Sequence, residues 1–255
     1  MGLGRCATWV GRSVMMVLLG GVGWGCGDAV GTVNGVGSAG FVEPDTGLVV
    51  VDADVLSDTD AQTSSTNQGL TVALVGGHDD VWSASARKDI SYCLDRESFG
   101  PWASTVESAM ADAIADWERS ANVHFVLLDH AACSRSTTSV VFDVRKVERR
   151  PYLARSFFPS SPRSQRELLV DGTALPPPSP LTLTGVLRHE LGHVMGLRHE
   201  HTRQADNPCY EDDNWRAVTS YDVRSVMHYP QCAGVMGRDL TLTPRDREGI
   251  ALLYP

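Results

Sequence analysis

From residue 89 onward, apolar residues recur with the two periods of regular secondary structure, whereas the preceding stretch shows neither. Alternating or β-branched runs predict strands at 90–94, 123–128 and 139–144. Within 101–121, apolar residues stand at helical spacing, at Val106, Met110, Ile114 and Trp117. This stripe is expected to face a hydrophobic core, which makes the helix a structural element.

Two further helices are predicted in the C-terminal half of the chain. The first begins at Thr182 or Thr184 and buries a stripe of apolar residues, Leu183, Val186, Leu187, Leu191 and Val194. The last has Thr243 as its N-cap and Pro244 at its first position. Before these helices, residues 166–170 are expected to form an exposed edge strand, although an ordinary surface strand fits the same pattern.

The first 26 residues have the features of a secretory signal peptide. They carry Arg5 and Arg12, no acidic residue and a short apolar stretch from Val14 to Leu19. Cys26 stands at the end of this segment, where a bacterial lipoprotein carries its lipid, although Trp24 is bulky for such a site. Two outcomes stay open, a lipid anchor at Cys26 or ordinary cleavage and release, and both place the protein outside the cytoplasm.

Residues 27–85 are interpreted as a low-complexity segment, and residues 86–255 as one folded domain. Gly, Ser, Thr and Asp dominate 27–70 with few aromatic residues, so this part buries too little apolar surface to fold. Composition favours a flexible tether over a pro-segment. The formal net charge of −9 makes nucleic acid an unsuitable partner.

The sequence HELGHVMGLRH, residues 189–199, holds the candidate chemistry. On a helix, His189 and His193 lie one turn apart on one face and can bind the same zinc ion. Gly196 is expected to end the helix in a left-handed conformation and bring His199 back as the third ligand. Three protein ligands leave a fourth position for water, which is typical of a catalytic zinc site.

Glu190 stands beside the predicted metal ligands. It is expected to act as general base on the water and to return the proton to the leaving amine. The alternative, a polar helix face without metal, requires five fixed positions to coincide by chance at a probability of about 10⁻⁵ to 10⁻⁴.

Together with SVMHY at residues 225–229, the histidine motif resembles the metzincin zinc endopeptidases. SVMHY is most similar to the astacin-like branch, whereas LARSFFP at 153–159 is more similar to the matrixin-like branch. The resemblance implies an α+β, zincin-like fold. It would have a twisted mixed sheet, two long helices above it, and a smaller irregular lower subdomain with a C-terminal helix.

The resemblance also assigns roles around the metal. Met227 would be the Met-turn methionine beneath the three ligands, and Tyr229 an extra ligand or a hydrogen-bond donor to the transition state. Metzincins pair an extended substrate with their edge strand. No Phe-x-Gly-Asp stretch of the kind that holds astacin pro-enzymes latent is present.

Four cysteines after the N-terminal segment, Cys93, Cys133, Cys209 and Cys232, indicate disulfides in an oxidising compartment. Of three pairings, Cys209 with Cys232 is favoured because these residues flank the segment between the third histidine and the Met-turn. Cys93 would then pair with Cys133. An acidic loop with Asp206, Glu211, Asp212 and Asp213 offers calcium ligands, but a solvated charged loop is the commoner outcome.

The sequence therefore predicts an exported, monomeric zinc endopeptidase that hydrolyses internal bonds of extended polypeptides. The membrane would be a partner through a lipid at Cys26 alone. A metal-stabilised binding or adhesion module of the cell envelope without turnover is the alternative, and the presence of Glu190 argues against it.

Overall fold

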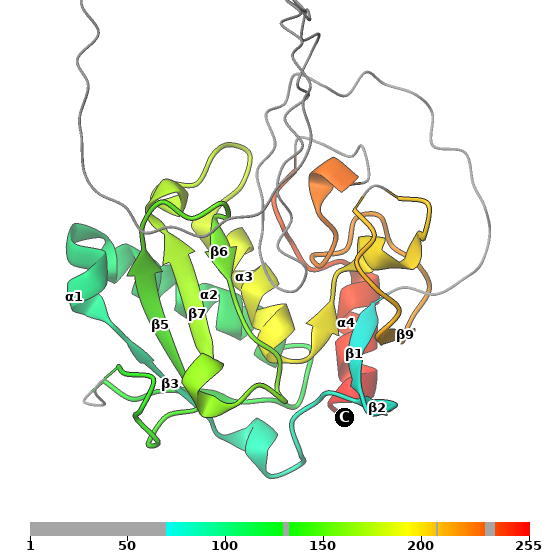
Figure 1. The fold of residues 1–255 in the computed structure, drawn as a ribbon, viewed down its shortest axis with the longest axis horizontal. Helices are drawn as coiled ribbons and strands as arrows, with labels where there is room; N and C mark the ends of the chain where they lie inside the picture. The colour runs from blue at the N-terminus through cyan, green and yellow to red at the C-terminus, as the bar shows by residue number, and fades with distance from the viewer. Residues whose placement is uncertain (1–69, 130–132, 208, 233–237) are drawn as a thin grey trace, which may run out of the picture. The chain divides into compact units, whose positions relative to one another are not determined.

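The computed structural model describes residues 70–129, 133–207, 209–232 and 238–255 (Figure 1). The predicted signal segment, Cys26 and residues 27–69 lie outside the described residues. None of the helices in the described part combines the length and apolar character needed to cross a bilayer.

A five-stranded mixed sheet forms one layer of the fold. Its strands, in spatial order, are β4 (Phe125–Leu127), β3 (Ile90–Leu94), β5 (Phe142–Val147), β7 (Glu167–Asp171) and β6 (Ala154–Arg155). The first four are parallel, and β6 runs antiparallel to β7. The predicted strand at 90–94 coincides with β3, and those at 123–128 and 139–144 overlap β4 and β5.

The predicted edge strand is wrong in its position. Residues 166–170 fall largely on β7, which lies inside the sheet between β5 and β6. Leu168 and Val170 are fully buried. The backbone N–H and C=O groups of a buried strand need hydrogen-bond partners on both sides. Strand β7 pairs with β5 on one side and with β6 on the other. The edge strand on this side of the sheet is therefore β6.

Two long helices pack together against this sheet (Figure 1). They are α2 (Ala103–Glu118) and α3 (Leu183–Val194), preceded by the short α1 (Arg96–Phe99). Trp117 of α2 is fully buried, and its indole Nε1 donates to the carbonyl of Arg188 on α3 at 2.9 Å. Arg188 also forms an ion pair with Asp116 at 2.6 Å. These contacts fix α3, which carries the histidine motif.

A second, smaller sheet lies next to the end of α3, which leads into its strand β8. It contains β1 (Thr71–Val75), β2 (His78–Asp79), β8 (Leu197–Arg198) and β9 (Trp215–Ala217). Strand β1 pairs antiparallel with each of the other three. Gly76 and Gly77 form its turn into β2, with φ of 59° and 81°. Such values suit glycine and the right-handed twist of a hairpin.

Residues 70–85, which the sequence assigns to the low-complexity segment, belong to the described fold. Leu70, Thr71 and Val72 are fully buried, although the sequence assigns them to the low-complexity segment. Their burial comes from pairing with β8 and β9, which lie over 100 residues later in the chain. Local composition contains no information about such distant partners.

The chain ends in α4 (Pro244–Leu253). Thr243 and Asp246 form a reciprocal capping box with Pro244 at the first position, so the predicted helix start is confirmed. Short 3₁₀ helices connect the elements: Ala86–Lys88, Gly100–Trp102, Arg163–Gln165, Gly172–Ala174, Glu200–Arg203 and Pro230–Cys232. The α+β class with a mixed sheet is confirmed.

Candidate metal centre

Helix α3 presents two of the predicted ligands to the interior. Its N-cap is Thr182, whose hydroxyl accepts from the backbone N–H of Gly185 at 2.9 Å. Asp239 accepts from the N–H of Thr182 at 2.9 Å and joins this helix end to the C-terminal region. His189 and His193 follow one turn apart near the other end, and both are fully buried.

Gly196 turns the chain toward the third ligand. It has a φ of 86°, a left-handed conformation that favours glycine. A Cβ at this position would also collide with the backbone oxygen of Asp80. The chain can therefore leave α3 sharply and return as β8, directly before His199. This is the role that the sequence predicts for the glycine.

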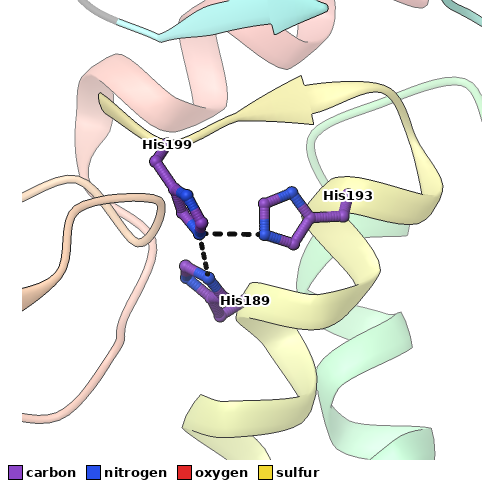
Figure 2. Close-up of side chains that lie close together, drawn as sticks. All are labelled: His189, His193 and His199. Atoms are coloured by element: carbon purple, nitrogen blue, oxygen red, sulfur yellow. Dashed lines mark hydrogen bonds between the residues drawn. The ribbon is translucent and has the colours of Figure 1, made fainter. Parts of the chain in front are cut away.

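The three imidazoles converge on one point (Figure 2). The Nε2 atom of His199 lies 3.2 Å from that of His189 and 3.1 Å from that of His193. Each ring uses its other nitrogen for a separate hydrogen bond. His189 Nδ1 lies 2.8 Å from the carbonyl of Val226, and His193 Nδ1 lies 2.7 Å from that of Leu197.

The arrangement fits a metal ion. Because each Nδ1 donates its proton to an oxygen, the three Nε2 atoms face one another as lone pairs. Ligands about 2.0 to 2.1 Å from a tetrahedral zinc ion lie about 3.3 Å apart, close to the separations found here. Burial, together with the neighbouring His199, lowers the pKa of His189 to about 3, so the ring is neutral at pH 7.

Glu190 lies on α3 between the two ligands and is fully buried. Both of its carboxylate oxygens lack a hydrogen-bond partner among the described residues. Burial raises its pKa well above the usual value, and the positive charge of Arg155 opposes this rise. A buried carboxyl group without a partner is costly, so it marks a place where the protein keeps a group for chemistry.

The turn at 225–229 lies beneath the histidines. A Cβ at Gly192 would collide with the sulfur of Met227, so the methionine packs directly against α3. The N–H of Glu200 donates to the Met227 carbonyl at 2.8 Å, which joins the histidine motif to this turn. Asp246 of α4 accepts from the N–H of Val226 at 2.9 Å. Because Val226 in turn holds His189, the C-terminal helix also supports the ligand set.

Tyr229 lies beside the three rings. Its ring centroid is 4.2 Å from that of His199 and 5.6 Å from that of His189. The side chain is fully buried, and its hydroxyl has no hydrogen-bond partner within the described part of the chain. Burial raises the pKa of the phenol well above 10, and the nearby Glu190 adds to this effect. The hydroxyl therefore stays protonated and can donate.

The cysteines form the two pairs that the sequence favours. Cys209 is bonded to Cys232, with Cα atoms 5.9 Å apart, and Cys93 to Cys133, with Cα atoms 5.6 Å apart. The first disulfide connects the loop after the third histidine to the segment that follows Tyr229.

The structure places Glu211 at the histidine cluster, whereas the sequence predicts it in a solvated acidic loop. Its side chain is 2% exposed, and it is bonded to His199 and Arg198. Burial raises its pKa, but the two histidines His199 and His201 outweigh this effect and lower it overall. Glu211 is therefore not a free calcium ligand, and the interpretation of this residue as solvated is wrong.

Comparisons with known proteins agree with the motif. High choriolytic enzymes 2 and 1 of Oryzias latipes are each 34% identical to this chain over 80 residues, which cover 24% of the chain and 28% and 29% of those enzymes. Low choriolytic enzyme of the same fish is 34% identical over 76 residues. The chain thus matches less than a third of each relative's length. The similarity confirms the resemblance to the astacin-like metzincins.

No family model matches the chain. The solved structure of myroilysin superposes with a TM-score of 0.49 and 17% sequence identity, over 72% of this chain and 98% of that one.

Proposed function

We propose that this protein is a zinc-dependent endopeptidase that cleaves internal bonds of extended polypeptides. The observation that carries the proposal is the convergence of three Nε2 lone pairs beside a buried glutamate to which no described residue donates a hydrogen bond. Zinc held by His189, His193 and His199 would supply Lewis acidity toward a peptide carbonyl and a water of lowered pKa.

Glu190 is the proton carrier of the proposed reaction. Its carboxylate takes a proton from the attacking water and gives it to the departing amine nitrogen. The raised pKa suits this role because a carboxyl group that titrates nearer neutrality both accepts and releases protons readily. Within the described part of the chain no group donates to its oxygens, which leaves them available to water and substrate.

Tyr229 is proposed to stabilise the oxyanion that develops on the substrate carbonyl. Its protonated hydroxyl lies at the histidine cluster and is not engaged by another described residue. A donor that is already in position strengthens its hydrogen bond as negative charge develops, which lowers the barrier.

The edge strand β6 is the proposed binding strand for substrate. It pairs with β7 on one side, and no described strand pairs with its other side. The outer side of an edge strand can bind an extended peptide through main-chain hydrogen bonds, which demands little of the peptide's sequence. Two disulfides fit an exported protein, which agrees with a peptide or protein substrate outside the cytoplasm.

The test is a comparison of two variants. Glu190→Ala should keep one zinc ion per chain and lose peptide hydrolysis by at least about 10²-fold, because only the proton carrier is removed. His193→Ala should lose both zinc and activity. Zinc is measured by elemental analysis, and hydrolysis with a casein or fluorogenic-peptide assay with and without 1,10-phenanthroline. Zinc binding without any chelator-sensitive cleavage by the wild type would instead favour the silent binding module.

A further inference from the structure

Glu211 is a buried carboxylate that the proposed reaction does not use. It lies in the loop between the third histidine and β9, in a sequence, Glu211-Asp212-Asp213, that reads as exposed. Its side chain is nevertheless 2% exposed. A charge buried to this extent is costly unless it is fully paired, so its contacts define what it does.

Both oxygens of Glu211 are engaged by residues of the zinc motif and its continuation. Oε1 accepts from Nδ1 of His199 and lies 3.4 Å from Nε2 of His201. Oε2 accepts from Nη2 of Arg198 at 2.7 Å. The carboxylate therefore holds the side chains of Arg198 and His199, the third metal ligand, and contacts that of His201.

The three candidate ligands differ in what holds them. His189 and His193 donate their Nδ1 protons to backbone carbonyls, at Val226 and Leu197. His199 donates its proton to the charged carboxylate of Glu211. A carboxylate acceptor fixes the tautomer and the plane of the ring, and it makes the opposite nitrogen a stronger electron donor to a metal. Among the three ligands, His199 alone receives this support.

The loop that carries Glu211 is itself held in place. The Cys209–Cys232 disulfide attaches it two residues earlier. The Asn207 side chain accepts from the N–H of Cys209 at 2.8 Å and donates to the carbonyl of Cys232 at 2.9 Å. Arg198 neutralises the carboxylate from β8. Such a fixed loop can position a ligand, whereas a mobile acidic loop cannot.

We propose that Glu211 is a positioning residue for His199 and sets the affinity of the three-histidine site for its metal. The inference rests on the proposed function, because it takes the three histidines to be metal ligands. It assigns part of the site's affinity to a loop outside the histidine motif.

The test measures the zinc dissociation constant of Glu211→Gln by competition with a chromophoric chelator at fixed pH. Glutamine keeps the size of the side chain but removes the charge, so zinc should bind about 10- to 100-fold more weakly than to the wild type. Asp212→Asn is the matched control, since Asp212 also pairs with Arg198, at 3.2 Å, and no contact with His199 is found for it. Its dissociation constant should stay within about threefold of the wild type.

A second readout separates positioning from stability. Affinities are measured at a temperature at which the metal-free variants are folded by circular dichroism, so a lower melting temperature alone does not change them. The d–d absorption of bound Co²⁺ should change in Glu211→Gln and not in Asp212→Asn, because it reports the ligand geometry. If Glu211→Gln does not fold, Glu211→Asp replaces it, which keeps the charge one methylene further from His199 and should also bind zinc more weakly.

Failure of the inference and failure of the proposed function give different results. A wild type that binds no zinc contradicts the function. A wild type that binds zinc, with equal affinity in the folded Glu211 variant, overturns the role of Glu211 and leaves the function standing.

Discussion

At the scale of single residues, Tyr229 allows metal binding and transition-state stabilisation to be tested separately. The ring packs between imidazoles, whereas the hydroxyl has no described partner. Removal of the hydroxyl should therefore leave the packing and the metal site intact. The variant should lack only the hydrogen-bond donor that is proposed to stabilise the oxyanion on the substrate carbonyl.

Tyr229→Phe is expected to lower kcat by about 10²-fold with a much smaller change in KM. The reason is that a hydrogen bond made mainly in the transition state contributes to kcat and not to ground-state binding. Steady-state kinetics on a fluorogenic peptide give both constants, and elemental analysis shows whether zinc is retained. A variant with full zinc content and wild-type kcat would rule out the proposed donor role.

The sequence predicts those site residues whose spacing along a helix or turn fixes where their side chains lie relative to one another. His189, His193 and His199 follow from a helical turn and a glycine, and the structure brings their Nε2 atoms together. Glu211 could not be found this way. It reaches His199 through the fold of an irregular loop, and its neighbours are acidic residues that look solvated. In an irregular loop, the number of residues between a carboxylate and a histidine does not show whether the two side chains are in contact.

At the scale of elements, strand β1 braces the metal-binding segment. Thr71 is fully buried, and its hydroxyl shares its one proton between the carbonyls of Arg198 and His199, at 3.1 and 3.2 Å. Trp82, which follows β2, donates from its indole to the carbonyl of Val194 at 2.7 Å. Residues 71–82 thus hold both the end of α3 and the strand that leads to the third ligand.

Thr71→Val should lower the free energy of unfolding by about 1 to 3 kcal/mol. Valine has nearly the same shape, so the loss comes from buried carbonyls that no longer receive a donor. Urea unfolding of the chelator-treated protein, followed by circular dichroism, measures the change. Thr105→Val on the exposed side of α2 is the control and should alter the free energy by no more than about 0.5 kcal/mol. Equal effects of both substitutions would contradict the bracing role.

Elements with strong local signals were predictable, and elements defined by distant pairing were not. The C-terminal helix begins where Thr243 and Pro244 predict it. By contrast, β1 is short and lies next to a polar stretch, and its partners are far along the chain. Strand β7 was misplaced as the edge because a sequence period shows which side chains are buried and not which strands lie alongside.

At the scale of the whole molecule, the structure buries ionisable groups of both signs. Burial lowers the pKa of His201 to about 4 and that of His228 to about 3. Burial also raises the pKa of Glu200 to about 8, although the charge of Arg203 opposes it. All of these groups are neutral in the folded protein near pH 6. The free energy of unfolding of the metal-free protein should therefore decrease both when the pH is lowered and when it is raised.

The histidines act on the acid side. Their pKa values are lower in the folded protein than the ordinary value of about 6.5, so below that pH the unfolded chain binds more protons. Stability contributed by the neutral His201 and His228 is therefore present above about pH 6.5. It is lost as the pH falls from there toward 4 and 3, by up to about 1.4 kcal/mol per pH unit for each group.

Glu200 acts on the alkaline side. Its pKa is raised on folding, so between about 4.5 and 8 the folded protein holds a proton that the unfolded chain has released. Stability must then fall as the pH rises through this window, until the carboxyl group ionises in both states. Below pH 6.5 the buried histidines contribute the larger change in stability, and above it the decline comes from buried carboxyl groups with raised pKa values, Glu200 and Glu190.

The metal-free protein should therefore be most stable between about pH 6 and 7 and less stable at pH 8 and at pH 5. Glu200→Gln should make the decline from pH 7 to 8 shallower, because glutamine has no proton to lose, and should leave the decline below pH 6 in place. Urea unfolding at half-unit pH steps in EDTA measures both limbs. The control is Glu248→Gln on the exposed face of α4, which should reproduce the wild-type profile. If the decline above pH 7 has the same slope in Glu200→Gln as in the wild type, the alkaline limb does not arise from this carboxyl group.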